Sequence, residues 1–176
     1  MNFYKNHVGM IIASIVALCL SLMMATAAIF VDHLAFTVPL WIKNWGTAFL
    51  TISITGMILP MTDWAFALGR RLHLTPNTLP HILLENFVAT FFFNTAACLV
   101  LAAVNIFANE SIAAAVAAGA APSVSAIFWS TFLRDWPIMF VLAFIFAFIV
   151  TKIAVKIAGK IVGELETETS PQRQPH

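Results

Sequence analysis

The sequence contains few charged residues. Only 10% of its 176 residues are Asp, Glu, Lys or Arg, whereas 61% are hydrophobic. About a quarter of the residues in a soluble domain are charged. A soluble fold of this size could not cover so much apolar surface, so the composition predicts an integral membrane protein. The net charge of +1 provides no concentrated basic face, which excludes a nucleic-acid partner.

The sequence also lacks the patterns of common catalytic and metal sites. It has no His-Glu-x-x-His, no serine nucleophile elbow and no phosphate-binding glycine loop. Its two cysteines, Cys19 and Cys98, both fall inside apolar runs, where a cysteine packs as a small hydrophobic residue. We therefore expect a protein that is not an enzyme, with no catalytic residue, no metal site and no cofactor.

Four stretches are apolar and long enough for a helix to cross a bilayer, which takes about 20 residues. They cover residues 8–31, 45–68, 86–108 and 136–158, and Pro60 and Asp63 interrupt the second. Barrel strands would alternate in polarity, so these continuous runs predict membrane helices. The first run continues through Val31 beyond an alanine-rich stretch, which favours a retained span over a signal peptide.

The connections divide the chain into two hairpins and a tail. The first hairpin is expected over residues 1–72 and the second over 84–160, while the polar residues 161–176 are expected to be disordered. An alanine-rich connection, residues 109–128, interrupts the second hairpin. Asn109 can cap a short helix there, Gly119 can end it and Pro122 prevents its continuation, which predicts a surface or re-entrant helix.

The distribution of cations predicts the orientation. With four spans and a cytoplasmic N-terminus, two cations, Lys43 and Arg134, lie outside and seven lie inside: Lys5, Arg70, Arg71, Lys152, Lys156, Lys160 and Arg173. This is the positive-inside bias of membrane proteins. Making the alanine-rich connection a fifth span would leave four cations inside and five outside, so we expect four spans and two cytoplasmic termini.

One short phrase occurs twice. Lys43-Asn44-Trp45 and Arg134-Asp135-Trp136 each place a cation, a polar or acidic residue and a tryptophan in a row. Upstream, "MATAAIFV" and "NTAACLVL" share a Thr-Ala-Ala step. We interpret the two halves as parallel hairpin repeats related by an axis along the membrane normal. The phrase then anchors each inward helix at the outer interface, with a paired ligand site as the alternative.

The same residues resemble a known family. "SLMMATAAIFVD" from Ser21, then "WIKNWGTAF" and Pro60, is similar to the bacterial membrane family called domain of unknown function 2798. The second half, "FNTAACLVLAAVN" and "FLRDWPIMF", has Phe132 in place of Trp41 and Thr151 in place of Pro60. The resemblance covers most of residues 8–157. It implies a bacterial inner-membrane protein of two tandem hairpins and brings no activity.

A few polar residues inside the spans are candidates for packing or for ligand binding. Asn94 falls near the middle of the third span, and we expect it to face Thr51 and Thr55 on the second. Asp63 is the only acid inside a span, near the inner interface, where we expect it to pair with Arg70 or Arg71. On the outer side, Asp32 is expected to pair with Lys43.

Two classes of function remain open. Lys152, Lys156 and Lys160 form an i, i+4 ladder that suits anionic inner-leaflet lipid. The absence of a charge at mid-membrane favours a non-enzymatic structural or accessory protein that contacts lipids, a second copy or another membrane protein. The alternative is a small four-helix transporter or efflux protein that acts as an oligomer.

Overall fold

The computed structural model describes residues 2–32, 34–76 and 78–169, and every regular element within these ranges is a helix. The helices are α1 (Asn2–Val31), α2 (Val38–Ile58), α3 (Met61–Arg71), α4 (Leu79–Phe107), α5 (Glu110–Ala117) and α6 (Val124–Thr169). The predicted all-α class is confirmed.

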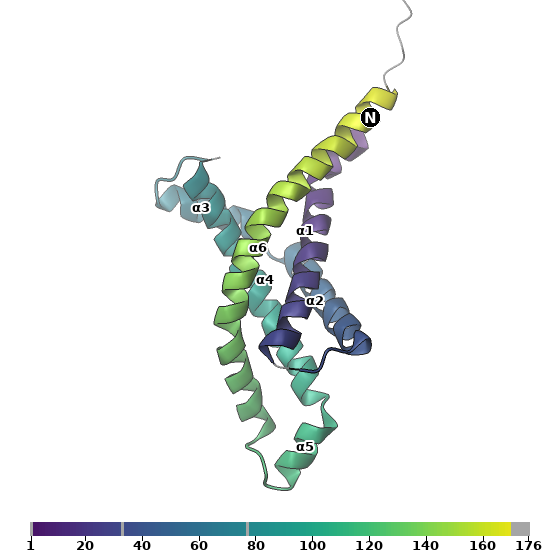
Figure 1. Cartoon of the computed structure of the whole chain (residues 1–176). Coiled ribbons are helices and arrows are strands. Elements are labelled where there is room, and N and C mark those ends of the chain that lie inside the picture. The colour runs from purple at the N-terminus through teal and green to yellow at the C-terminus, as the bar shows by residue number, and fades with distance from the viewer. Residues whose placement is uncertain (1, 33, 77, 170–176) are drawn as a thin grey trace, which may run out of the picture.

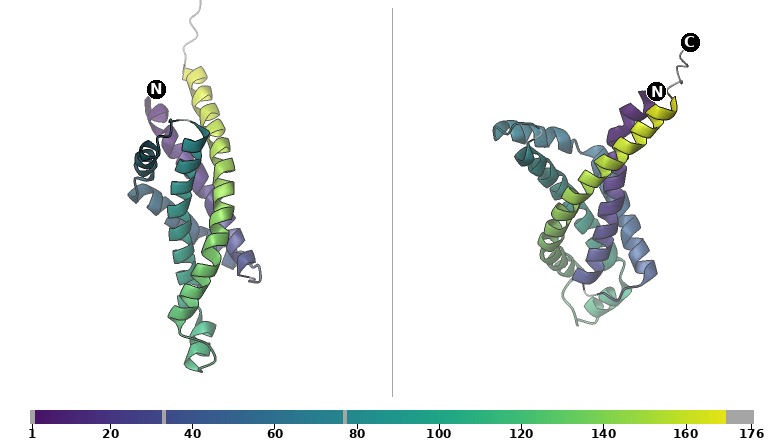
Figure 2. Two further views of the ribbon diagram at one scale, coloured as in Figure 1. Left: turned by 90° about the vertical axis from the view of Figure 1, so that its left-hand side faces the viewer. Right: turned by 45° about the horizontal axis from the view of Figure 1, so that its top comes forward.

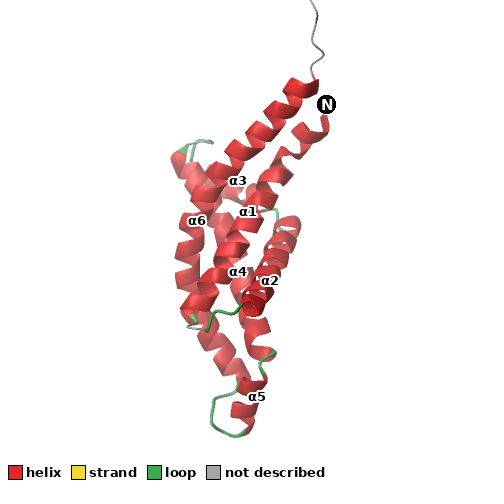
Figure 3. Cartoon of the chain, turned by 45° about the vertical axis from the view of Figure 1, so that its right-hand side comes forward, coloured by secondary structure: helices red, strands yellow, loops and turns green. Residues whose placement is uncertain are grey.

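Four of the helices form a bundle in a closed ring. Helix α1 packs on α2 and α6, and α4 packs on the same two neighbours (Figure 1). The N-terminus and the last turns of α6 lie at one end of the bundle, and α5 lies at the other (Figure 2). Short loops link the long helices (Figure 3). The first turn of α1 and the last turns of α6 therefore lie at the same end of the bundle.

The helices fit a multi-pass membrane protein. Three of them contain a stretch long and apolar enough to cross a membrane, namely Ile11–Val31, Leu79–Phe107 and Val124–Ile161. The bent pair of α2 and α3 counts as a fourth candidate if the two helices form one broken span. The described chain therefore has three or four candidate crossings.

The expected second span is broken by Pro60. Helix α2 ends at Ile58, Leu59 is extended at φ −95° and ψ 125°, and α3 leaves at an angle of 61°. Proline has no N–H and forces the residue before it out of the helical region, which accounts for the break. The interruption expected at Pro60 is therefore a break between two helices, α2 and α3.

The short helix expected in the alanine-rich connection is present as α5. The connection itself is shorter than the expected residues 109–128, because α6 begins at Val124. Asn109 Oδ1 accepts hydrogen bonds from the backbone N–H groups of Ser111 and Ile112, and Gly119 has φ +69°. Helix α6 begins at Val124, and Ser123 Oγ accepts from the N–H of Ala126. Because of this cap, residues 124–128 belong to α6 and not to the connection.

Both copies of the repeated phrase lie inside helices and not at their first residues. Helix α2 begins at Val38, before Lys43, and its first turn contains Pro39, whose fixed φ suits that position. Helix α6 starts ten residues before Arg134. Both helices therefore start earlier than the predicted spans, which began at Trp45 and Trp136.

The end of α6 corrects the predicted tail. The helix continues to Thr169, so residues 161–169 are helical, and residues 170–176, including Arg173, lie outside the described residues. Lys160 and Glu164 have the i, i+4 spacing that supports a helix, and Glu and Lys are good helix formers. The complete helix of 46 residues is about 69 Å long, more than twice the hydrocarbon thickness of a bilayer.

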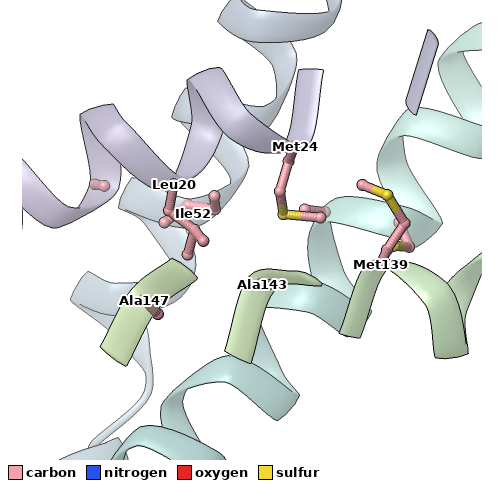
Figure 4. Close-up of a cluster of buried hydrophobic side chains, with 9 residues drawn as sticks. Leu20, Met24, Ile52, Met139, Ala143 and Ala147 are labelled. Atoms are coloured by element: carbon pink, nitrogen blue, oxygen red, sulfur yellow. The ribbon is translucent and has the colours of Figure 1, made fainter. Parts of the chain in front are cut away.

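The centre of the bundle is filled by small and flexible apolar side chains. Leu20 and Met24 of α1 meet Ile52 of α2 and the α6 residues Met139, Ala143 and Ala147 (Figure 4). Small residues let membrane helices approach closely, and methionine fills irregular gaps between them. Ala154 and Ala158 are fully buried and continue the alanine stripe of α6.

Helix α3 is held against α4 by a close approach at Gly69. A Cβ atom at Gly69 would lie 2.9 Å from Cδ2 of the buried His81 ring. That ring also packs on Phe66, with centroids 4.8 Å apart, and its Nδ1 is 3.6 Å from Glu85 Oε1. The position requires a residue without a side chain.

We expect Gly69→Ala to weaken the contact between α3 and α4. The added methyl group must displace the buried imidazole, and overpacking of this kind costs about 1–3 kcal/mol. Thermal unfolding in detergent micelles measures the loss. Gly46→Ala is the matched control, since a Cβ there has no atom within 4 Å. Equal melting temperatures for the two variants would contradict the tight α3–α4 contact.

Candidate functional site

Three charged side chains meet where α1 ends beside α6. Arg134 Nη2 donates to Asp32 Oδ1 at 2.5 Å, and Arg134 Nε donates to Asp135 Oδ1 at 2.6 Å. Asp32 directly follows α1, whereas the other two are neighbours on α6, so this acid cluster joins the first half of the chain to the second. The expected pairing of Asp32 with Lys43 is not met among the described residues, because Arg134 takes its place.

The two aspartates of the acid cluster are largely buried, and the arginine is exposed. The side chains of Asp32 and Asp135 are 21% and 13% exposed, while that of Arg134 is 56% exposed. Two carboxylates share one guanidinium, so with both acids ionised the cluster carries a net charge of −1. Charges held out of water in this way need close partners.

A small cavity lies against the acid cluster. It has a volume of about 30 Å³, enough for about one water molecule. Asn105 Oδ1, on its wall, is buried and has no hydrogen-bond partner. The cavity is lined by Ala28, Val31, Asp32, Cys98, Leu101, Ala102, Asn105, Thr131, Phe132, Asp135 and Met139. The cavity therefore suits a small hydrogen-bond donor such as water, which could donate to the two carboxylates and to the amide oxygen of Asn105.

The environment of Asp32 disfavours its charged form. The residue lies just beyond the candidate span Ile11–Val31. Burial, followed by the neighbouring Asp135 carboxyl group, raises the pKa of Asp32 from 3.8 to about 6, although Arg134 acts in the opposite direction. Asp32 is therefore able to exchange a proton close to neutral pH.

Asn94 lies in the interior, but its partner is not on α2. Its side chain is fully buried, and its Nδ2 donates to the backbone oxygen of Trp136 on α6 at 3.2 Å. Cys98 Sγ lies 3.6 Å from Asn94 Oδ1. Thr51 Oγ1 donates instead to the backbone oxygen of Thr47 on its own helix at 2.8 Å. Asn94 therefore bonds to α6 and not, as expected, to Thr51 or Thr55 of α2.

Two further hydrogen bonds join α4 to α6. Asn86 Nδ2 donates to the backbone oxygen of Phe144 at 3.0 Å. Asn86 lies eight residues before Asn94 on α4, and Phe144 lies eight residues after Trp136 on α6. The indole N–H of Trp136 donates to Thr95 Oγ1 at 2.9 Å. These bonds fix one antiparallel register between α4 and α6. Asn86 and Thr95 were not among the predicted site residues, although each is a polar residue within an apolar run of the sequence.

The first half contains a matching tryptophan–threonine bond. Trp41 Nε1 donates to Thr26 Oγ1 at 3.0 Å, joining α2 to α1. Thr26 and Thr95 occupy the same place in the Thr-Ala-Ala step, but the donor in the first half is Trp41, whereas the repeated phrase aligns Trp45 with Trp136. Trp45 stacks on Trp41 with centroids 6.0 Å apart, and its buried indole nitrogen has no hydrogen-bond partner.

The remaining candidates lie on the surface. Asp63 is exposed in the first turn of α3, where a negative charge suits the helix N-terminus, and no described contact pairs it with Arg70 or Arg71. Lys43 and the ladder of Lys152, Lys156 and Lys160 are also exposed. Lys152 Nζ lies 4.2 Å from the ring centre of Phe148.

The described residues offer no group of three or more His, Cys, Asp or Glu side chains that could hold a metal ion. No protein-family model matches the chain, and no curated protein or solved structure matches it either.

We expect the hydrogen bond between Trp136 and Thr95 to be measurable as a coupling energy. In a double-mutant cycle with Trp136→Phe and Thr95→Val, the coupling should be about 0.6 kcal/mol, the average for such bonds in membranes. Unfolding in mixed micelles gives the four stabilities. Trp41→Phe with Thr26→Val forms the matched cycle in the first half. Additive effects in both cycles would show that neither bond stabilises the bundle.

Proposed function

We propose that the chain is a non-enzymatic accessory protein of the bacterial inner membrane that acts through its surfaces. The observation that carries this proposal is the filled centre of the bundle, where side chains of α1, α2 and α6 meet. Large apolar side chains cover the outside instead, among them Phe30, Leu50, Met57 and Ile145, each more than half exposed. Such faces suit lipid, a second copy of the chain or another membrane protein.

The proposal includes four crossings arranged as two parallel hairpins, α1 with α2–α3 and α4 with α6. The matching tryptophan–threonine bonds, Trp41 to Thr26 within the first half and Trp136 to Thr95 within the second, support it. If the membrane covers Ile11–Val31, Asp32 lies at its outer edge, and Arg134 lies at the same level because the two side chains are bonded. Arg134 and Trp136 then serve as interface anchors from within a helix, while α5 projects beyond the membrane.

The similarity to the family called domain of unknown function 2798 belongs to the same proposal. It is supported by the quoted residues around Ser21, Trp41 and Pro60. Two of these residues have clear structural roles, since Trp41 bonds α1 to α2 and Pro60 breaks the helix. Lys152, Lys156 and Lys160, on the end of α6 that carries the termini, are proposed to contact anionic lipid headgroups.

Both termini are expected in the cytoplasm. Reporter fusions that distinguish the two sides of the membrane, placed after His176 and after Gly119, measure this. The C-terminal fusion should report cytoplasm and the Gly119 fusion should report the outer side, because the cations are concentrated at the end that carries the termini. An outer signal from the C-terminal fusion together with a cytoplasmic signal from the Gly119 fusion would contradict the proposed orientation. The same signal from both fusions would contradict four crossings.

The acid cluster and its water-sized cavity favour a second candidate, a transporter that moves protons or small cations. Proteoliposomes that enclose a pH-sensitive dye distinguish the two functions when a potassium diffusion potential drives proton entry. We expect the rate to equal that of protein-free liposomes, because buried apolar side chains of the described helices fill the centre of the bundle between the two ends. Liposomes with a protonophore provide the positive control.

A rate above the protein-free baseline that Asp135→Asn abolishes would overturn the accessory function and establish the transporter. Lys43→Gln is the matched control, since this exposed cation makes no ion pair among the described residues. A raised rate that both variants keep would instead indicate leakage through the liposomes and leave the accessory function in place.

A further inference from the structure

With both acids ionised, the acid cluster has one more negative than positive charge, and a single bound proton would neutralise this excess. Two carboxylates, those of Asp32 and Asp135, contact one guanidinium, and both acids are largely buried. Asn105 Oδ1 faces the same cavity and accepts no hydrogen bond. We propose that Asp32, Arg134 and Asp135 form a proton-binding latch, in which one proton bound by the two acids tightens the contact between the end of α1 and α6.

A proton fits this place better than a metal ion. Arg134 already occupies one oxygen of each carboxylate, so a divalent cation would lie against the guanidinium. The cavity of about 30 Å³ holds about one water molecule, which could donate to Asn105 Oδ1. Two carboxylates that share one site typically bind one proton between them.

Few other titratable groups face Asp32. Helix α4 contributes Cys98 to the cavity wall and α6 contributes Asp135, while Arg134 of α6 is bonded to Asp32 itself. Lys43 on α2 and Glu110 on α5 are exposed and form no ion pair among the described residues. His33 follows Asp32 in the chain and lies outside the described residues, so the experiment includes it as a control.

The direction of the effect follows from the environment of Asp32. Burial and the Asp135 carboxyl raise the pKa of Asp32 from 3.8 to about 6 in the folded protein, so folding favours the protonated form. The stability from the bound proton is complete below about pH 3.8 and is lost as the pH rises through about 6. The bundle should therefore be more stable in mild acid than at neutral pH.

Thermal unfolding of the full chain in detergent micelles tests the latch. The wild type should melt several degrees higher at about pH 5 than at about pH 7.5, and Asp32→Asn should remove this difference, because the amide cannot ionise. Asp63→Asn, which changes an exposed acid on α3, and His33→Gln should both keep the difference. A pH difference that persists in Asp32→Asn, or disappears in Asp63→Asn or His33→Gln, would overturn the proposal.

A second readout does not depend on unfolding. Cys98 is 5% exposed and lines the cavity, so its reaction with a maleimide reports opening of the contact between α1 and α6. In a Cys19→Ser background at about pH 7.5, the chain with Asp32 should react several-fold faster than the chain with Asp32→Asn. At about pH 5 the two rates should be equal. Equal rates at both pH values would show that protonation does not tighten the contact.

Discussion

Helix α4 bonds to both the side chain and the backbone of Trp136, and the arrangement of the second half of the chain depends on these two hydrogen bonds. Its indole N–H donates to Thr95, and its backbone oxygen accepts from Asn94. Within lipid there is no water to replace either partner, and apolar burial gives little drive for helices to associate. A small number of directed bonds therefore fixes the register between α4 and α6, and alanines and methionines then complete the packing.

Two of the eight prolines, Pro60 and Pro137, show how tertiary contacts decide whether a helix continues. Pro60 ends α2, and Leu59 before it is extended. Pro137 lies inside α6 without ending it, although a proline in a helix costs about 3 kcal/mol. The residue before Pro137 is Trp136, which accepts one hydrogen bond from α4 and donates another to it, whereas the described hydrogen bonds of Leu59 are local, to Thr55 and Met61. The same residue type therefore breaks one helix and is accommodated in the other.

The acid cluster connects the fold to both candidate functions. It lies where the first half meets the second, beyond the end of α1 and next to the water-sized cavity. An accessory protein could use it to adjust how firmly the halves are held together. A transporter would need it to open toward the far end of the bundle, and the filled centre between Leu20 and Met139 separates the two ends.

The sequence by itself determined the class of the protein, because apolar runs of about 20 residues leave a helix in lipid as the favoured structure. It also determined the short helix after Asn109, because caps and glycine turns depend on neighbouring residues alone. Only the tertiary structure decided that Asp32 pairs with Arg134 and not Lys43, and that Asn94 meets Trp136 and not Thr51 or Thr55. Both pairs join residues far apart in the chain, and local patterns give the depth of a polar side chain but not the neighbour that it faces. The order of helices around the bundle sets that neighbour, and it arises from packing of the whole chain.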